Sequence, residues 1–322
     1  MLEIAAELER ALDAGHRVGV VTVAAVHGSA PRTVGSAMAV TSTGDVIGAI
    51  SGGCVESEAH ELARAALDGR AAPSSTLGLS DGDALAAGLA CGGHLTVVVS
   101  VLSPADAGVR EQLRAASCGE AAALDVALDD GAVTPAATAS HPWLDAGILH
   151  LARPPAPRLI IVGAVDFSSA LATAARPLGY RITVVDARPA FATTARHPDA
   201  HEVIRAWPGE YLAGTEVRPR DAICILTHEE RFDIPALVSA LATEAAYVGA
   251  MGSRRTDGRR RELLRQAGVQ EAALSRLRSP IGLDLGAVTP AETAVSIVAE
   301  IVAGKSRAPR LSETSGPIHA RA

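Results

Sequence analysis

The first half of the chain mixes segments of helical period with runs of β-branched residues. Between residues 2 and 14, apolar side chains recur every three or four positions with charges between them, which predicts an amphipathic helix. The run Val18–Val26 is rich in valine and predicts a buried strand. Further patterns predict a hairpin over 36–41 and 45–50, a helix ending near Leu67, a strand over 95–102 and short strands within 118–151. The first half is therefore α+β or α/β.

Strands and helices alternate in the second half. Apolar runs at 158–162, 181–185, 222–226 and 246–248 predict strands, and helical patterns cover 167–178, 234–243, 256–267 and 290–303. This alternation predicts a mostly parallel sheet with helices on both faces. The proline-rich segment 153–157 predicts a linker between a first domain, 1–152, and a second, 158–304. Residues 305–322 are expected to form a polar tail.

Composition narrows the class of protein. The 322 residues are 48% hydrophobic and 20% charged but only 2% aromatic, so the cores must be built from Ala, Val, Leu and Ile. A net charge of −7 argues against a nucleic-acid partner. The chain has no cationic leader and no apolar run of the roughly 20 residues that a membrane helix needs, so no integral membrane segment is expected. We therefore expect a cytoplasmic protein whose four cysteines are free thiols.

The loop after the first strand of the second half resembles a damaged dinucleotide-binding loop. Gly163 keeps the first glycine of the pattern G-x-G-x-x-G, but Val165 and Ser168 replace the other two. Asp166 is expected to satisfy the N–H groups of the helix that follows and to repel a phosphate. Asp186 ends the second strand, where a ribose-binding acid belongs. We therefore expect a Rossmann-like domain in which NAD(P) does not bind in the usual pose. Alternatively, Gly163 is only a tight turn and Asp166 a helix cap.

Two glycine–cysteine loops stand out in the first half. They are Gly52-Gly53-Cys54 and Cys91-Gly92-Gly93. Cys54 is expected near a helix N-terminus, which favours a thiolate, and Glu56 in the first turn of that helix. Such loops suit an anion, a metal–sulfur group or a reactive thiol, or else they are tight turns with small buried cysteines. A zinc site is not expected, because the chain has no Cys-x-x-Cys pair.

The chain resembles the XdhC/CoxI family, the maturation factors of molybdenum hydroxylases that are also called xanthine dehydrogenase accessory proteins. The likeness extends in order along nearly the whole chain. The motifs that carry it are Gly28-Ser29-Ala30-Pro31-Arg32, Gly52-Gly53-Cys54-Val55-Glu56, Cys91-Gly92-Gly93, Asp186-Ala187-Arg188-Pro189, Thr227-His228, Gly249-Ala250-Met251-Gly252-Ser253-Arg254-Arg255 and Gly282-Leu283-Asp284-Leu285-Gly286-Ala287. Each motif alone is weak evidence for the family, but the seven together are specific to it.

The resemblance implies a maturation chaperone rather than a turnover enzyme. Such a protein binds molybdenum cofactor (molybdopterin), supports its sulfuration and passes it to a molybdenum hydroxylase such as xanthine dehydrogenase or carbon monoxide dehydrogenase. The expected partners are the apo molybdenum hydroxylase and a cysteine desulfurase, and a homodimer is an open expectation.

The resemblance also assigns roles to particular residues. Cys54 and Cys91 are candidate thiols on the molybdenum side of the cofactor, with Glu56 nearby, and Arg32 is a candidate for its phosphate, or else a solvated surface arginine. In the second domain, Ser253, Arg254 and Arg255 lie in a glycine-rich loop that opens a helix, and they form a candidate anion cradle or else a solvated helix start. The remaining candidates for binding the cofactor are Gly52, Gly53, Gly92, Gly93, Gly163, Asp186, His228, Gly252, Ser253 and Arg254.

Two other functions stay open from the residues alone. Asp186 and the fold are compatible with an NAD(P)-dependent oxidoreductase, although this argument is one of analogy. A non-catalytic scaffold that only binds a partner enzyme would also explain the incomplete Gly163 loop.

Overall fold

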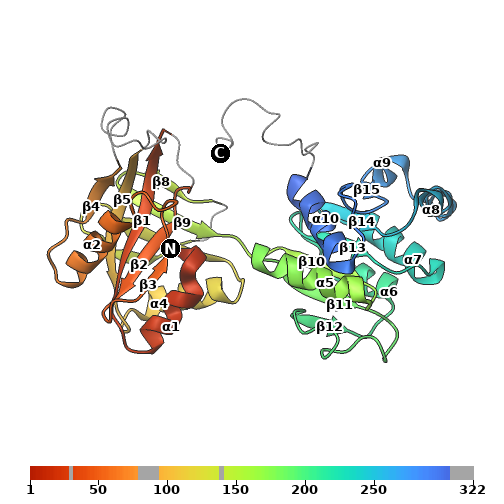
Figure 1. Ribbon diagram of the computed structural model, residues 1–322, viewed down its shortest axis with the longest axis horizontal. Coiled ribbons are helices and arrows are strands. Elements are labelled where there is room, and N and C mark those ends of the chain that lie inside the picture. The colour runs from red at the N-terminus through yellow and green to blue at the C-terminus, as the bar shows by residue number, and fades with distance from the viewer. Residues whose placement is uncertain (29–31, 79–93, 138–140, 305–322) are drawn as a thin grey trace. The chain divides into compact units, whose positions relative to one another are not determined.

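The computed structural model describes residues 1–28, 32–78, 94–137 and 141–304. The chain divides into two compact units, and the boundary falls between Pro155 and Ala156 (Figure 1). Arg153, which we assigned to the linker, is the last residue of a strand and pairs with Ala122. The predicted polar tail lies outside the described residues.

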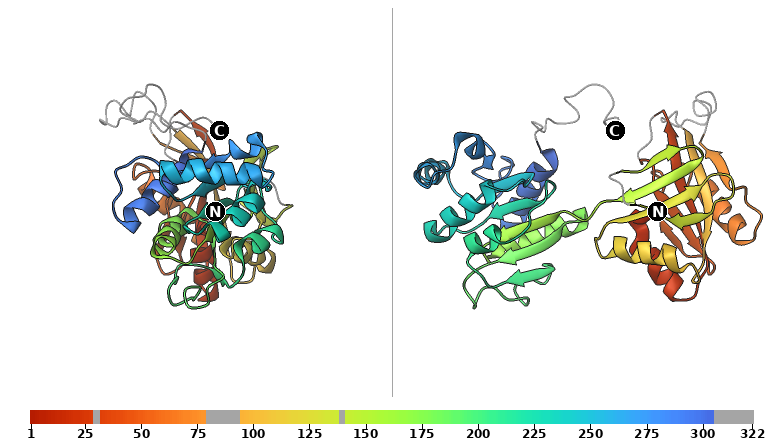
Figure 2. Two further views of the ribbon diagram at one scale, coloured as in Figure 1. Left: turned by 90° about the vertical axis from the view of Figure 1, so that its right-hand side faces the viewer. Right: turned by 180° about the vertical axis from the view of Figure 1, so that it is seen from behind.

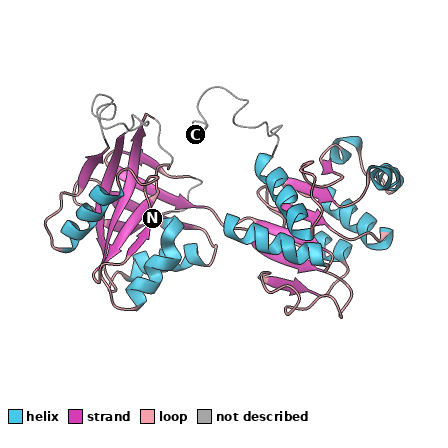
Figure 3. Ribbon diagram, viewed as in Figure 1, coloured by secondary structure: helices cyan, strands magenta, loops and turns pink. Residues whose placement is uncertain are grey.

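The first unit contains two antiparallel sheets and is α+β (Figures 1 and 3). One sheet has the strand order β3-β2-β1-β5-β4 and the other the order β7-β6-β9-β8. The described elements are η1 (Leu2–Ile4), α1 (Ala5–Asp13), β1 (Val18–His27), β2 (Ala37–Thr41), β3 (Val46–Gly48), α2 (Glu56–Leu67), β4 (Ser74–Leu77), β5 (His94–Leu102), α4 (Ala107–Ser117), β6 (Ala122–Ala127), β7 (Val133–Pro135), β8 (Trp143–Asp145) and β9 (Ile148–Arg153). Viewed from behind, the smaller sheet appears in yellow to green (Figure 2).

Strand β1 is buried on both faces along most of its length, which explains why its sequence is rich in valine and alanine and does not alternate between apolar and polar residues. Val18 and Val20 pack in a core with α1, α4 and the smaller sheet. Val21 and Val23 pack in a second core with α2. Gly19 lets α2 approach closely, because a Cβ at this position would lie 2.2 Å from the Ala63 carbonyl oxygen.

Helix α4 was missed by the sequence prediction. Its buried residues Val109, Leu113 and Ala116 have the spacing of one helix face. The charged and polar residues between them face outward and hide this short stripe. The strands predicted within 118–151 are confirmed as β6 to β9.

The second unit contains one parallel sheet of six strands. Its order, β12-β11-β10-β13-β14-β15, corresponds to 3-2-1-4-5-6 along the chain, which is the Rossmann order. The elements are β10 (Arg158–Val162), α5 (Asp166–Ala175), η2 (Arg176–Leu178), β11 (Arg181–Val185), β12 (Glu202–Ile204), α6 (Pro208–Ala213), β13 (Ala222–Ile225), α7 (Glu230–Leu241), β14 (Tyr247–Ala250), α8 (Arg254–Gln266), α9 (Glu271–Leu274), β15 (Leu277–Arg278) and α10 (Pro290–Ala303). The predicted Rossmann-like fold is confirmed.

Helices cover both faces of the parallel sheet (Figure 1). Successive residues of β10 point to opposite faces: Leu159 and Ile161 pack with α5 and α10, whereas Ile160 and Val162 pack with α6, α7 and α8. Because β10 is buried on both faces, its residues 159–162 are all apolar.

Gly163 lies where the strand order reverses, between β10 and β13. Its φ is +100°, and a Cβ there would lie 2.4 Å from the Thr227 Cγ2 atom. Only glycine lets the turn after β10 pass Thr227 this closely. The packing of the turn against Thr227 therefore requires a glycine at this position.

We predict that Gly163→Ala destabilises the second unit by about 2 kcal/mol more than Gly179→Ala does. Gly179 is the matched control, because its φ of +81° carries a similar backbone cost with no atom near its Cβ. Trp143 lies in the first unit and Trp207 in the second, so urea unfolding of a Trp143→Phe chain followed by tryptophan fluorescence reports the second unit. Equal losses of unfolding free energy in the two variants would show that close packing against Thr227 does not require glycine at position 163.

Candidate functional site

The loop before α2 is closed by hydrogen bonds between its own residues. The Glu56 carboxylate accepts the Ser51 N–H at 2.9 Å and the Ser51 hydroxyl at 2.7 Å. It also accepts the Val55 N–H at 3.3 Å. The Ser51 Oγ in turn accepts the N–H groups of Gly53 and Cys54, each at 3.2 Å. These bonds fix the backbone of Gly52-Gly53-Cys54 in one conformation.

Glu56 therefore holds the loop and is not a free ligand. Burial raises the pKa of its carboxyl, but the hydrogen bonds from Ser51 and the backbone outweigh this effect and lower the pKa below its usual value. Cys54 is exposed and free, and it precedes the first helical residue, Glu56, by two positions. The loop thus presents one thiol to the solvent.

The second glycine–cysteine loop, Cys91-Gly92-Gly93, lies outside the described residues. His94, the first described residue after it, stacks on His27 with the ring centroids 4.5 Å apart. These two rings lie at the paired ends of β1 and β5. No described group of three His, Cys, Asp or Glu side chains is arranged to hold a metal ion.

Arg32 is only partly available for an anion. Its guanidinium lies 3.6 Å from the Glu3 carboxylate, and both side chains are more than a third exposed. Glu3 also accepts the Ala37 N–H at 3.2 Å. The ion pair is therefore a weak surface interaction that an incoming anion must compete with.

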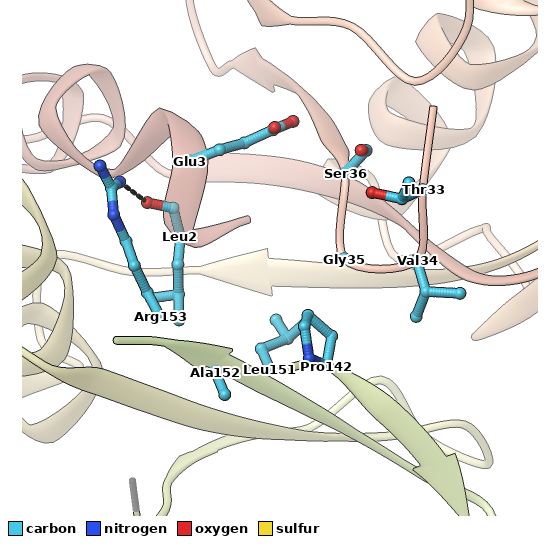
Figure 4. A pocket seen from close by; sticks show the side chains of 10 residues that line it. All are labelled: Leu2, Glu3, Thr33, Val34, Gly35, Ser36, Pro142, Leu151, Ala152 and Arg153. Atoms are coloured by element: carbon cyan, nitrogen blue, oxygen red, sulfur yellow. Dashed lines mark hydrogen bonds between the residues drawn. The ribbon is translucent and has the colours of Figure 1, made fainter. Parts of the chain in front are cut away.

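A cavity of about 250 Å³ lies nearby in the first unit (Figure 4). Arg153 donates a hydrogen bond across its wall to the Leu2 carbonyl oxygen at 2.6 Å. The other lining residues are Glu3, Thr33, Val34, Gly35, Ser36, Pro142, Leu151 and Ala152. None of the site residues expected from the sequence lines this cavity.

In the second unit, Asp186 occupies the donors of the turn at Gly163. Its carboxylate accepts the Ala164 N–H at 2.7 Å and the Arg188 N–H at 2.8 Å, and it pairs with the Arg188 guanidinium at 2.8 Å. Burial raises the pKa of Asp186, yet these bonds lower it overall. The residue expected to bind a ribose is therefore already saturated with hydrogen bonds from its own chain.

The expectation for Asp166 was wrong. Asp166 is the first residue of α5, and Val165 is the N-cap. The Asp166 side chain is 84% exposed and pairs with Arg196 at 3.3 Å instead of accepting a helix N–H group. Ser168, which stands in place of the third glycine, is buried, and its hydroxyl donates a hydrogen bond to the Gly163 carbonyl oxygen.

A buried ion pair that the sequence did not reveal joins α7 and α8, the helices that follow β13 and β14. Arg260 and Asp233 lie 3.2 Å apart and are each at most 4% exposed. Thr227 donates to Asp233, and Arg260 donates to the Met251 carbonyl oxygen at 2.7 Å. Burial raises the pKa of Asp233 against the opposing effect of these partners. Breaking such a pair costs about 3–5 kcal/mol, because one charge is left buried and unpaired.

The other expected residues of this unit lie at the carboxyl edge of the sheet. His228 follows β13 and is exposed. Gly252 precedes the N-cap of α8, Ser253, whose hydroxyl accepts the Thr256 N–H at 3.1 Å. The exposed Arg254 guanidinium makes no hydrogen bond or ion pair with any residue that the structure describes. It is free to bind an anion at this helix start.

His197 is a second feature that the sequence analysis missed. Its side chain is 1% exposed, and neither ring nitrogen has a hydrogen-bond partner among the residues that the structure describes. Burial, with the charge of Arg196, lowers the pKa of this imidazole. The folded protein therefore holds His197 in its neutral form.

Comparison with known proteins identifies the family. A model described as the XdhC and CoxI family matches residues 11–77, and a model of the XdhC Rossmann domain matches residues 159–301. The chain belongs to the XdhC and CoxI family. The described residues of this XdhC-type protein contain no helix long and apolar enough to cross a membrane.

Relatives match the XdhC-type chain over most of its length. A probable xanthine dehydrogenase subunit of Bacillus subtilis (strain 168) is 28% identical over 312 residues, covering 89% of this chain and 92% of that protein. The molybdenum cofactor insertion chaperone PaoD of Escherichia coli (strain K12) is 25% identical over 300 residues, covering 90% and 84%. A crystal structure described as a xanthine dehydrogenase from Bacillus halodurans has a TM-score of 0.73 at 27% identity and covers 95% of this chain and 98% of that one.

We predict that Glu56→Gln opens the Ser51–Val55 loop, because an amide puts an N–H group where the carboxylate accepts hydrogen bonds. Hydrogen exchange at the Gly53, Cys54 and Val55 amides should accelerate about tenfold or more. The control is Glu58→Gln, since Glu58 lies in the same first turn but makes no hydrogen bond or ion pair with the described residues. Unchanged exchange in Glu56→Gln would show that the carboxylate does not hold the loop.

We also predict that the second unit loses stability as the pH falls from about 7 to 5, because unfolded His197 with its usual pKa of about 6.5 binds a proton that the folded form resists. His197→Leu should flatten this dependence, whereas His228→Leu, at an exposed position, should not. Urea unfolding of the Trp143→Phe chain at several pH values measures both. If His197→Leu left the pH dependence of the unfolding free energy unchanged, the claim that His197 is buried and neutral would be contradicted.

Proposed function

We propose that this XdhC-type protein binds molybdenum cofactor and assists its sulfuration and its insertion into a molybdenum hydroxylase such as xanthine dehydrogenase or carbon monoxide dehydrogenase. The observation that carries the proposal is the match to the PaoD insertion chaperone along 90% of this chain. The Bacillus subtilis relative, described as part of a probable xanthine dehydrogenase, supports the same class of target. A chaperone role, with the apo-hydroxylase as partner, accounts for both likenesses.

The residues of the first unit are chemically suited to such a cofactor. A thiolate is a soft ligand that suits a metal–sulfur group, and Cys54 is exposed, free and held on a fixed loop. The bound cofactor would supply the molybdenum centre. Cys54, with Cys91 from the second glycine–cysteine loop, is proposed to face that centre, while Glu56 positions the loop.

Anionic parts of the cofactor need cationic partners. Arg32 in the first unit and Arg254 in the second are exposed guanidinium groups that suit a phosphate. Of the two, Arg254 is favoured, because Glu3 competes for Arg32. NAD(P) is compatible with a Rossmann fold. However, the Ala164 N–H of the turn after Gly163 already donates to Asp186, which argues against the usual pose of NAD(P).

Contact with a cysteine desulfurase, a cytoplasmic location and a homodimer complete the proposal. Sulfuration needs a sulfur donor, and a desulfurase provides one. The desulfurase and the homodimer derive from the family resemblance, and the location derives from the cysteine content and the sequence of the N-terminus.

The test is retention of molybdenum cofactor through anaerobic gel filtration, measured as molybdenum per protein chain. The wild-type chain should retain the cofactor, and Cys54→Ser should lower retention about tenfold or more. Cys118→Ser is the matched control, because Cys118 is also exposed and free but ends α4. Absence of retention by the wild type would overturn the function, and equal retention by the two variants would overturn the role of Cys54.

A further inference from the structure

Helix α10 covers one face of the parallel sheet and turns an apolar face to the solvent (Figure 1). A surface helix of a globular protein normally carries charged and polar side chains on the face away from the core. Val288, just before the N-cap of α10, is 86% exposed, Val295 is 56% exposed and Val302 is 69% exposed. Leu285, in the loop that leads to the helix, is 56% exposed. The outer face of α10 is therefore apolar where charges are expected.

The two charged residues of α10 are both used within the second unit. Glu292 caps the start of the helix, where its carboxylate accepts the Val288 N–H at 2.8 Å. Glu300 accepts the Tyr247 hydroxyl at 2.5 Å and the Gly282 N–H at 2.8 Å. The helix contains no other charged residue. Its outer face therefore offers no free charge to a ligand or a partner.

The apolar positions of the outer face have the spacing of a helix-packing seam. They recur alternately three and four residues apart, which is the a and d pattern of helices that pack side by side. We call these residues the α10 seam: Val288, Ala291, Val295, Val298 and Val302. A different stripe, which includes the buried Ala294 and Ile297, holds α10 on the sheet. The seam is therefore a second apolar stripe that the fold of the unit leaves largely uncovered.

A second copy of the chain suits this seam better than a different protein does. In a twofold dimer the same surface of both copies meets, so residues approach their own counterparts. Because the seam carries no charge, this approach brings no like charges together, although each chain has a net charge of −7. Interfaces between different proteins take much of their specificity from complementary charges, which the seam does not offer.

The polar tail of the chain does not suit the seam. The tail, residues 305–322, contains only two large aliphatic residues, Leu311 and Ile318, seven positions apart. Two such side chains are too few to cover a stripe of five apolar positions. A second α10 helix, in contrast, carries a stripe of the same length and spacing.

We propose that the α10 seam packs against the α10 seam of a second copy about a twofold axis. Val295, at the centre of the seam, then lies beside its own counterpart whether the two helices run parallel or antiparallel. The helix is about 21 Å long, which is short for a specific interface of about 1,200–2,000 Å², so we expect a weak dimer with a dissociation constant on the order of micromolar.

The proposal deepens the proposed function, because it names the surface of the homodimer. The two can fail separately. A chain that stays monomeric but retains molybdenum cofactor would overturn the α10 dimer and leave the proposed function intact.

The experiment is sedimentation equilibrium of the full chain from low micromolar to several hundred micromolar concentration. The wild-type chain should dimerise. Val295→Asp should weaken the dimer about 100-fold or more, because two carboxylates would meet in an apolar contact. The matched control is Val46→Asp, because Val46 is 55% exposed but lies in β3 of the first unit, and it should leave the dimer unchanged. Added salt should not weaken the wild-type dimer, since no ion pair holds it.

A second variant, Val302→Asp, tests the same seam seven residues farther along and should also weaken the dimer. Urea unfolding followed by Trp207 fluorescence in the Trp143→Phe chain should show that both seam variants fold with an unchanged midpoint. A monomeric wild-type chain would overturn the proposal. A dimer that resists Val295→Asp, or that Val46→Asp weakens equally, would overturn it as well, because the contact would lie elsewhere. A monomeric chain whose urea midpoint falls in Val295→Asp would show that its own chain covers the seam, which also contradicts the proposal.

Discussion

The hydrogen bond from the Ala164 N–H to Asp186 organises the ligand edge of the second unit. It joins the turn after β10 to the end of β11, and Asp186 also holds Arg188 through its backbone and its guanidinium. Arg188 then lies against Phe191 and Phe232. One buried carboxylate thus fixes the turn, an arginine and the rings around it. The same bond uses a donor that a dinucleotide-binding loop would offer to a phosphate.

The loop around Cys54 in the first unit follows the same principle. There Glu56 accepts two backbone N–H groups and the Ser51 hydroxyl, so that a glycine-rich loop has one conformation. In both units, a carboxylate that sequence reasoning assigns to a ligand is used to hold a loop. In the first unit, the group that the loop leaves exposed to the solvent is the Cys54 thiol.

Much of the fold could be predicted from local patterns. Strands buried on both faces are mostly apolar, as β1 and β10 are, and Gly163 marks the turn that the Rossmann order requires. Side-chain partners far apart in sequence could not be predicted. From the sequence, either Asp166 or Asp186 could accept a hydrogen bond from the backbone of the turn. Asp186 does so, because β11 pairs with β10 and brings Asp186 next to the Ala164 N–H. Arg260 lies 27 positions from Asp233, and its helix pattern is that of a solvated basic face. His197 lies in an irregular segment without any periodic signal.

The central claim is that the Ala164 N–H is committed to Asp186 and is not offered to a ligand. A ¹H–¹⁵N correlation spectrum of the full chain, recorded as pyrophosphate is added to millimolar concentration, tests it directly. The account predicts that the Ala164 amide resonance does not move, because its hydrogen bond is already made within the protein. A saturable shift of that resonance would show that the turn binds phosphate and would contradict the account.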